Sequence, residues 1–329
     1  MQRVGRRPMK RFAMATAAAI SLLATGNLAL AEYPERPVTV IVPWSAGGGT
    51  DATGRIIATM LEEKLGQPFN VVNRTGGGGI VGHTAIKDAN ADGYTIGIIT
   101  TELSMYDAVG SAPLTYTDYS LVGLYNADPS AVFVRADSDY QTIGDLAEAV
   151  EADPEAIQAS GANFGGINHL SWVSMVQGLG LDGAQSNWVP AEGGAPALQL
   201  LASGAIDVAV VQFPEAQGLM DAGEIRALAT LGSEPNAKHP DVPPVTEALG
   251  IDFAIAGWRG VGGPAGMPDD IVATLTGALD EIVASQAFRD QMGRLNYGVV
   301  WADGSEFADY LQNRGEAFGA AISAAGLGQ

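Results

Sequence analysis

The sequence of 329 residues contains no cysteine. Disulfide bonds and a lipid-bearing amino-terminal cysteine are therefore excluded, and a chain of this length buries a large enough core to be stable without disulfides. Histidine is also rare. His83, His169 and His239 lie far apart, and none of them pairs with a His or Glu at i, i+4 spacing, so the sequence predicts no metal site.

Basic residues are scarce and unevenly placed. Lys and Arg number 17 against 37 Asp and Glu, which gives a net charge of −20. Part of the basic charge is concentrated near the amino terminus, at Arg3, Arg6, Arg7, Lys10 and Arg11, so the remainder is more acidic still. Such a chain does not bind nucleic acid or an anionic membrane surface non-specifically. An anionic ligand would have to be held by backbone N–H groups and a few local charges.

The first 31 residues have the composition of an export signal. The basic cluster precedes a largely apolar stretch from Phe12 to Leu30, and Ala29-Leu30-Ala31 is an A-x-A cleavage signal. We therefore expect cleavage after Ala31 and a mature protein outside the cytoplasm. After this segment no run of 18 or more apolar residues occurs, so the sequence predicts no membrane span.

Two consecutive strand–turn–helix units follow the export signal. The β-branched run Val38–Val42 leads into the glycine-rich turn 44–51 and a helical pattern that stops at Gly66, and Phe69–Val72 leads into a second glycine-rich turn, 73–79, and another helix. The carboxyl ends of parallel strands share one edge of a sheet, so the two turns bring helix N-termini into one crevice. This arrangement predicts an anion site.

The same alternation continues along the chain and predicts two α/β domains. A strand 94–99 ends in Thr100-Thr101-Glu102, and this end is expected beside the two glycine turns. Short strands at 121–124 and 131–134 flank a crossing at Asp128-Pro129, and Thr142 with Asp145 forms a capping box. Further predicted segments are the glycine-rich turn 161–166, the strands 187–190, 206–211, 228–231 and 297–301, a return crossing at 253–263, a helix from Pro268 and a last helix at 305–324. We expect mostly parallel sheets flanked by helices, with domain 1 at 32–127 plus 258–329 and domain 2 at 128–257.

The glycine motifs also match a dinucleotide-binding pattern. Gly47-x-Gly49-x-x-Ala52 and Gly77-x-Gly79-x-x-Gly82 both fit, but Asn73-Arg74 stands where the acidic ribose-binding residue is required, and the Gly-Lys-Ser/Thr of a phosphate loop is absent. We expect no cofactor. Alternatively, the glycines serve only tight turns and close helix packing, which explains one such turn better than several in register.

Candidate catalytic residues are few. Ser45 is not in a G-x-S-x-G elbow, and no base is indicated beside it, so we expect no catalytic residue. Asp51 is expected to order its turn by accepting backbone N–H bonds, and His169, near a helix start, to cap or pack if it is not a ligand contact. Trp44, Trp188 and Trp258 follow strands and favour packing, although Trp44 can also line the cleft.

Several motifs, taken in order, resemble the tripartite tricarboxylate transporter substrate-binding proteins, also called Bug-type periplasmic receptors. The likeness covers essentially the whole mature chain. The motifs are Tyr33-Pro34-x-x-Pro37, the turn 42–51 (family P-F-x-P-G-G-x-x-D), the turn 73–82 (family N-R-x-G-A-G-G-x-x-G), Asp92-Gly93-Tyr94-Thr95, Trp258-x-Gly260 and Pro264-Ala265-Gly266-x-Pro268.

The resemblance implies a two-domain Venus flytrap of the type II kind that closes over a small carboxylate. Carried over by position, the implied ligand-binding residues of the first domain are Trp44, Ser45, Gly48, Gly49, Thr50, Asp51, Asn73, Gly78, Gly79, Thr100 and Thr101. Those of the second domain are Ser160, Asn163, His169, Ala191 and Gly193. Arg74 is either a further contact or a solvated turn residue.

The second domain departs from the family pattern. Glycines 161 and 166 replace the usual hydroxyl residues, and Ala191-Glu192 replaces an aromatic and a basic residue. We expect a roomier, less cationic pocket, which favours a mono- or dicarboxylate, with room for an amino or aromatic group, over a tricarboxylate.

The resemblance thus implies a monomeric periplasmic receptor without catalysis that delivers its ligand to the membrane subunits of a tripartite tricarboxylate-type transporter. An exported hydrolase-like enzyme on the same fold, or a sensory receptor for a membrane kinase, are the alternatives.

Overall fold

The computed structural model describes residues 33–251, 255–324 and 326–328, together with the first two residues. The predicted export signal with its cleavage site, and the part of the return crossing around Phe253, lie outside this part of the chain. In the described residues no single helix is long and apolar enough to cross a membrane, although α8 (Asp269–Ala284) and α9 (Gln286–Arg294), bent by 67° at their junction, meet that criterion as a pair.

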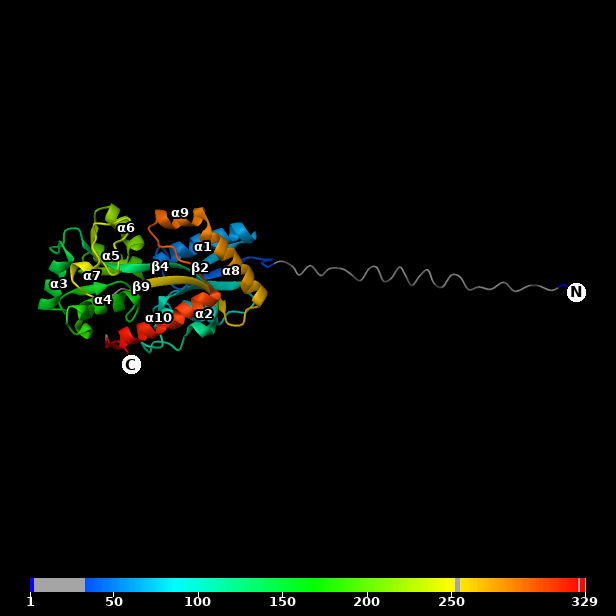
Figure 1. The fold of residues 1–329 in the computed structure, drawn as a ribbon, viewed down its shortest axis with the longest axis horizontal. Helices are drawn as coiled ribbons and strands as arrows, with labels where there is room; N and C mark the ends of the chain where they lie inside the picture. Colours follow the sequence, from blue (N-terminus) through cyan, green and yellow to red (C-terminus); the bar gives the residue numbers. More distant parts are fainter. Residues whose placement is uncertain (3–32, 252–254, 325, 329) are drawn as a thin grey trace.

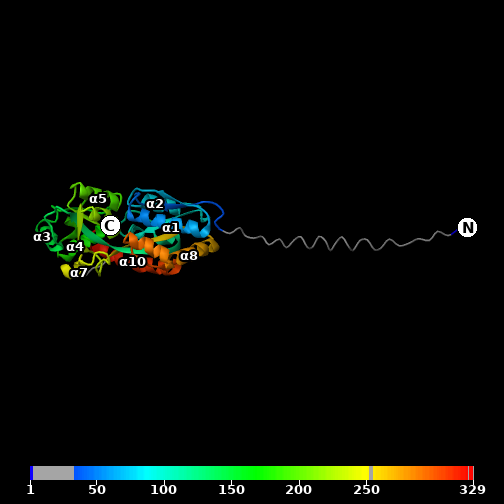
Figure 2. The same ribbon diagram turned by 90° about the horizontal axis from the view of Figure 1, so that it is seen from above.

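The chain forms two lobes that lie side by side (Figure 1). The first lobe contains β1 (Val38–Val42), α1 (Gly49–Leu65), β2 (Phe69–Asn73), α2 (Ile80–Lys87), β3 (Thr95–Thr100), the 3-10 turns η1 (Thr101–Ser104) and η2 (Tyr116–Asp118), α8 (Asp269–Ala284), α9 (Gln286–Arg294), β10 (Ala302–Asp303) and α10 (Gly304–Ala324). The view from above shows the same division (Figure 2).

The second lobe contains α3 (Ile143–Ala152), β5 (Gln158–Ser160), α4 (Ile167–Gly178), the 3-10 turn η3 (Gly183–Gln185), β6 (Asn187–Trp188), α5 (Gly194–Ala202), β7 (Val208–Gln212), α6 (Phe213–Asp221), β8 (Ile225–Thr230) and α7 (Val245–Ala248). The long strands β4 (Tyr119–Arg135) and β9 (Ala256–Pro264) connect the lobes.

The strand order is β2-β1-β3-β9-β4-β7-β5-β6, and β10 and β8 also pair with β4. The pairs of β1 with β2 and β3, and of β5 with β6 and β7, are parallel, whereas β4 and β9 are antiparallel to their neighbours. The carboxyl ends of the parallel strands β1, β3 and β7 lead into the segments that face the other lobe.

The crossing at Asp128-Pro129 differs from the prediction of two short strands, because β4 is continuous for 17 residues. Pro129 pairs with Ala256, where β9 begins, and at Ser130 the pairing passes to Gln212 of β7. A proline has no N–H to donate to the ladder, and at this change of partners the missing donor interrupts the pairing least. The strand predicted at 297–301 is also not formed, since β10 begins only at Ala302.

Local signals fix several helix ends as the sequence predicts. α1 ends at Gly66, which has a φ of 72° and donates its N–H to the Glu62 carbonyl. In α3, Asp145 N donates to Thr142 Oγ1 at 3.2 Å, and Thr142 N donates to Asp145 Oδ2 at 2.8 Å. This is the predicted capping box.

Each lobe has its own apolar core. In the first lobe, buried residues of β1 and β3 pack against α1 and α8, and in the second, Trp172 of α4 packs with residues of β7 and α3. A smaller apolar cluster joins the lobes, where Phe318 and Ile322 near the end of α10 contact Ile167 and Leu170 of α4.

Candidate functional site

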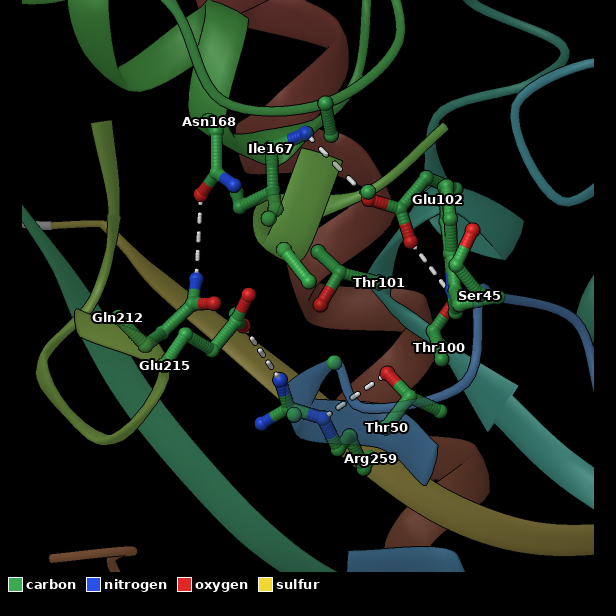
Figure 3. A pocket seen from close by; sticks show the side chains of 18 of the residues that line it. Ser45, Thr50, Thr100, Thr101, Glu102, Ile167, Asn168, Gln212, Glu215 and Arg259 are labelled. Carbon is green, nitrogen blue, oxygen red and sulfur yellow. Dashed lines mark hydrogen bonds and ion pairs between the residues drawn. The ribbon is translucent and has the colours of Figure 1, made fainter. Parts of the chain in front are cut away.

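A cavity of about 50 Å³ lies between the two lobes. Its first-lobe wall is formed by Trp44, Ser45, Gly48, Gly49, Thr50, Thr100, Thr101 and Glu102, and its second-lobe wall by Ala162, Ile167, Asn168, Gly193, Gly194, Ala195, Gln212 and Glu215. Gly257, Trp258 and Arg259 of β9 complete it, and Figure 3 shows the polar side chains converging on this space.

The cavity is small because the lobes touch across it. Ser45 Oγ donates a 2.7 Å hydrogen bond to the Glu192 carbonyl, and the Ile167 N–H lies 3.5 Å from Glu102 Oε1. Each of these bonds joins one lobe to the other. The structure is therefore a closed arrangement of the two lobes.

The turn after β1 is held by Asp51 and Asn73, which do not line the cavity. Asp51 Oδ2 accepts hydrogen bonds of 3.0 Å from Gly47 N and Arg55 Nε, and its Oδ1 accepts one of 2.9 Å from Asn73 Nδ2. Burial raises the pKa of Asp51, but these hydrogen bonds outweigh it, and the net shift is downward. Asp51 and Asn73 thus position the turn that places Ser45 and Gly49 at the cavity.

The glycine-rich turn after β2 lies beside the cavity but does not line it. Four consecutive glycines, 76–79, all have positive φ, a conformation that side-chain-bearing residues rarely adopt. Gly78 faces Asn163 of the other lobe, and Gly79 faces Trp44 and Tyr106, but neither glycine lines the cavity. Arg74 is exposed and likewise does not line it.

His169, Ser160 and Ala191 lie outside the cavity lining. His169 Nδ1 accepts a hydrogen bond of 2.9 Å from Gly165 N, and its ring lies between Phe164 and Trp188. Burial lowers the pKa of His169 to about 3, so the ring is neutral. The Ser160 hydroxyl is buried, and no partner for it occurs among the described residues. Ala191 is half-buried, whereas Gly193, with a φ of 118°, caps α5 and lines the cavity.

The glycine at 161 has a packing reason. A Cβ at this position would lie 2.0 Å from the Val210 carbonyl oxygen and 2.8 Å from the Asn168 Cβ. No side chain fits so close to the backbone of β7. The close approach to β7 therefore requires a glycine at this position.

Arg259 is the basic side chain of the cavity and is not among the residues predicted for the site. Its Nε donates to Thr50 Oγ1 at 3.1 Å, its Nη1 to Asn126 Oδ1 at 2.6 Å, and its Nη2 to Glu215 Oε1 at 3.4 Å. Asp128 Oδ2 lies 3.7 Å from Nη1. A signal existed, because Arg259 is a charged residue inside the Trp258-x-Gly260 motif of an apolar strand.

Glu102 and Glu215 were also missed as site residues. Burial raises the pKa of Glu215 to about 6, with Arg259 opposing the rise and Asp128 and Glu102 adding to it. Burial likewise raises the pKa of Glu102, against hydrogen bonds from Thr100 and the backbone. Both residues come just after the carboxyl end of a strand, the position at which α/β proteins place ligand contacts.

The comparisons with known proteins agree with this architecture. The family model described as "Tripartite tricarboxylate transporter family receptor" matches residues 53–327. A protein of Pseudomonas sp. strain P51, described as a UPF0065 protein in the tcbD-tcbE intergenic region, is 29% identical over 317 residues, which cover 95% of this chain and 92% of that protein.

Two solved structures share the fold closely. R. palustris Rpa4515 with adipate has a TM-score of 0.83 and 26% identity, and covers 90% of this chain and 99% of its own. MatC (Rpa3494) from Rhodopseudomonas palustris with bound malate has a TM-score of 0.80 and 27% identity, with coverage of 88% and 100%. The predicted two-domain Venus flytrap fold is thus confirmed. With a family match over most of its length, the chain belongs to the tripartite tricarboxylate transporter receptor family, the TctC/Bug family of solute-binding proteins.

Proposed function

We propose that the protein captures a small organic carboxylate, a mono- or dicarboxylate rather than a tricarboxylate, between its lobes. The main support is the cavity itself, on which the turn at Ser45–Gly49 and the first turn of α5 converge from opposite lobes. α1 begins at Gly49, and a helix N-terminus offers free N–H groups and a positive dipole end to an anion. The relatives solved with malate and adipate support this ligand class.

In this proposal a hinge motion encloses the ligand. The lobes touch across the cavity, where Ser45 Oγ donates to the Glu192 carbonyl, so a carboxylate enters when the lobes separate. The hinge lies in β4 and β9. The boundaries that we propose place 32–127 and 258–329 in domain 1 and 128–257 in domain 2.

We further propose that the receptor acts in the periplasm as a monomer, after cleavage behind Ala31, and hands its ligand to the membrane subunits of a tripartite tricarboxylate-type transporter without catalysis. The family to which the chain belongs and the composition of its first 31 residues support this assignment.

Native mass spectrometry of freshly purified protein, followed by a panel of carboxylates, tests the proposal. We expect a retained small acid or a member of the panel to raise the Tm, because a ligand at 100 times its Kd adds about 2.7 kcal/mol to the free energy of unfolding. Trp44 and Trp258 line the cavity, so the same acid should change the tryptophan fluorescence. A broad panel that changed neither the Tm nor the fluorescence would contradict the proposal.

A further inference from the structure

Two buried carboxyl groups face the cavity from opposite lobes. Glu102 on η1 is 4% exposed, and the side chain of Glu215 on α6 is 7% exposed. Figure 3 shows both side chains directed into the space between the lobes. Burial raises the pKa of both carboxyl groups, and Glu215, with a pKa of about 6, is ionised at pH 8 and therefore has the same charge as an anionic ligand.

The positive charge of Arg259 is already paired within the protein and is not available to a ligand. Its three nitrogen atoms already donate to Thr50, Asn126 and Glu215, and Asp128 lies beside it. Among the described residues that line the cavity, it is the sole basic side chain. A ligand carboxylate therefore finds no unpaired cation. The N–H groups of Gly47 and Gly48 already donate to Asp51 and Ser45, so the backbone donors left for it are those at the start of α1, which begins at Gly49.

The carboxylate of Glu215 itself lies at the helix N-termini that could hold an anion. Its Oε1 lies 2.8 Å from where a Cβ on Gly49 would be, and its Oε2 lies 1.7 Å from the corresponding point on Gly194. Gly49 and Gly194 are the first residues of α1 and α5. The carboxylate of Glu215 thus sits beside two helix N-termini, whose dipoles favour its charged form.

The amide of Gln212 adds a third acceptor, whose direction is set by a hydrogen-bond relay. Asn168 Nδ2 donates to the Gly161 carbonyl at 3.4 Å, so Asn168 Oδ1 faces Gln212 and accepts from its Nε2 at 3.1 Å. Nε2 also lies 3.3 Å from Ser130 Oγ. Gln212 is 4% exposed, lines the cavity, and finds no donor for its Oε1 among the described residues. Figure 3 shows this oxygen on the side of Glu215.

We infer that the ligand carries a protonated nitrogen beside its carboxylate, with the nitrogen held by Glu102, Glu215 and Gln212 and the carboxylate held by the Ser45–Gly49 turn. The inference rests on the proposed function and names the ligand class of that site. An ammonium group has three N–H donors and no acceptor. It therefore matches a wall on which three side chains present acceptor oxygens to the ligand and none presents a free N–H or O–H group. It also compensates the buried negative charge that Arg259 leaves unbalanced.

Matched pairs of acids test the inference by titration calorimetry at pH 8: succinate with aspartate, glutarate with glutamate, and adipate with 2-aminoadipate. We expect the amino member of a pair to bind at least ~10-fold more tightly than its partner, because it alone offers charge-assisted hydrogen bonds to both glutamates. Equal or tighter binding of the unsubstituted acid would overturn the inference and leave the proposed function intact. Absence of binding by every probe, together with a broad carboxylate panel that changed neither the Tm nor the fluorescence, would instead contradict the proposed function, and the inference with it.

Two substitutions identify the side chains responsible. Glu215→Gln and Glu102→Gln should each lower the affinity for the amino acid by about 10-fold or more. The affinity for the unsubstituted acid should stay the same or increase. Glu148→Gln, an exposed position on α3, is the matched control and should change neither affinity. Retention of the full preference for the amino member in both cavity variants, with a native circular dichroism spectrum, would overturn the assignment.

The pH dependence of the wild-type protein gives a test that needs no variant. Arg259 on β9, Asp128 on β4 and Glu102 on η1 face Glu215, and its pKa of about 6 results mainly from burial. As the pH falls from 8 to 5, Glu215 takes up a proton and loses its charge, so the affinity for the amino acid should fall. A protonated Glu215 would instead donate to a plain carboxylate and strengthen its binding. An amino acid that bound more tightly at pH 5 would contradict the inference.

Discussion

Arg259 of β9 and Glu215 of α6 form an ion pair with an N–O distance of 3.4 Å between a strand shared by both lobes and a helix of the second lobe. Both side chains are 7% exposed, and Asp128 lies 3.7 Å from the same guanidinium. A buried charge without its partner is costly, so this cluster is a structural element as well as a wall of the cavity.

We predict that Arg259→Ala lowers the free energy of unfolding at pH 8 by about 3–5 kcal/mol, because it leaves Glu215 and Asp128 buried without their cation. Urea denaturation measures the change. Arg36→Ala, which removes an exposed ion pair with Asp92, is the control and should have a far smaller effect. Equal effects of the two substitutions would show that the buried cluster does not stabilise the fold.

His83 should make the protein sensitive to acid. Its Nε2 accepts the Thr100 N–H at 3.2 Å and its Nδ1 lies 2.9 Å from the Tyr106 hydroxyl, which donates to the Gly78 carbonyl. Burial lowers the pKa of His83 to about 4, from an ordinary value of 6.5. The folded state thus favours the neutral ring, and the stability that this contributes is complete above pH 6.5 and lost as the pH falls through 4.

The size of this contribution is on the order of 3 kcal/mol, from 1.36 kcal/mol per pKa unit. The difference in free energy of unfolding between wild type and His83→Gln, measured from pH 7 to pH 4, should shrink by this amount or reverse. His239→Gln, at a half-buried ring, should give a much flatter difference. A pH-independent difference for His83→Gln would refute this account of the ring.

Gly161→Ala should destabilise the second lobe. Its Cβ would meet the Val210 carbonyl oxygen at 2.0 Å, and that atom belongs to the backbone of a buried strand. Overpacking of this kind costs about 1–3 kcal/mol. Gly277→Ala, on the exposed side of α8 with no atom within 4 Å of the new Cβ, should be neutral or slightly stabilising. Thermal unfolding measures the Tm of both variants. Equal Tm values would be evidence against the close approach of residue 161 to β7.

The repeated strand–turn–helix pattern allowed much of the fold to be predicted from the sequence. β-branched runs followed by glycine turns gave β1 and β2 with α1 and α2, and the Thr142–Asp145 box marked the start of α3. The rule that ligand contacts follow strand ends predicted an anion site at the first turns. The family resemblance then implied individual residues, of which Ser45, Gly48, Gly49, Thr50, Thr100 and Thr101 line the cavity. Applied equally to every strand, the same rule would have included Glu102 and Glu215.

Other features depend on contacts between distant segments. The pairing of Arg259 with Glu215 spans 44 residues and has no local signal. The continuity of β4 through Pro129 depends on the change of partner from β9 to β7, which the sequence of β4 does not contain. Asp51, Asn73 and His169 have residue types that suit ligand contacts, yet each is committed to hydrogen bonds with its own neighbours.

The central claim is that the first turn of α1 holds a carboxylate between the lobes. Calorimetric titration of wild type and Gly49→Val with the acid that binds best tests it most directly, with Gly277→Val as the matched control. A side chain at position 49 would project to within 2.6 Å of Arg259 Nη2 and 2.8 Å of Glu215 Oε1. We predict one binding site in wild type and in the control, and no measurable binding in Gly49→Val with a native circular dichroism spectrum. Unchanged affinity in that variant would contradict the claim.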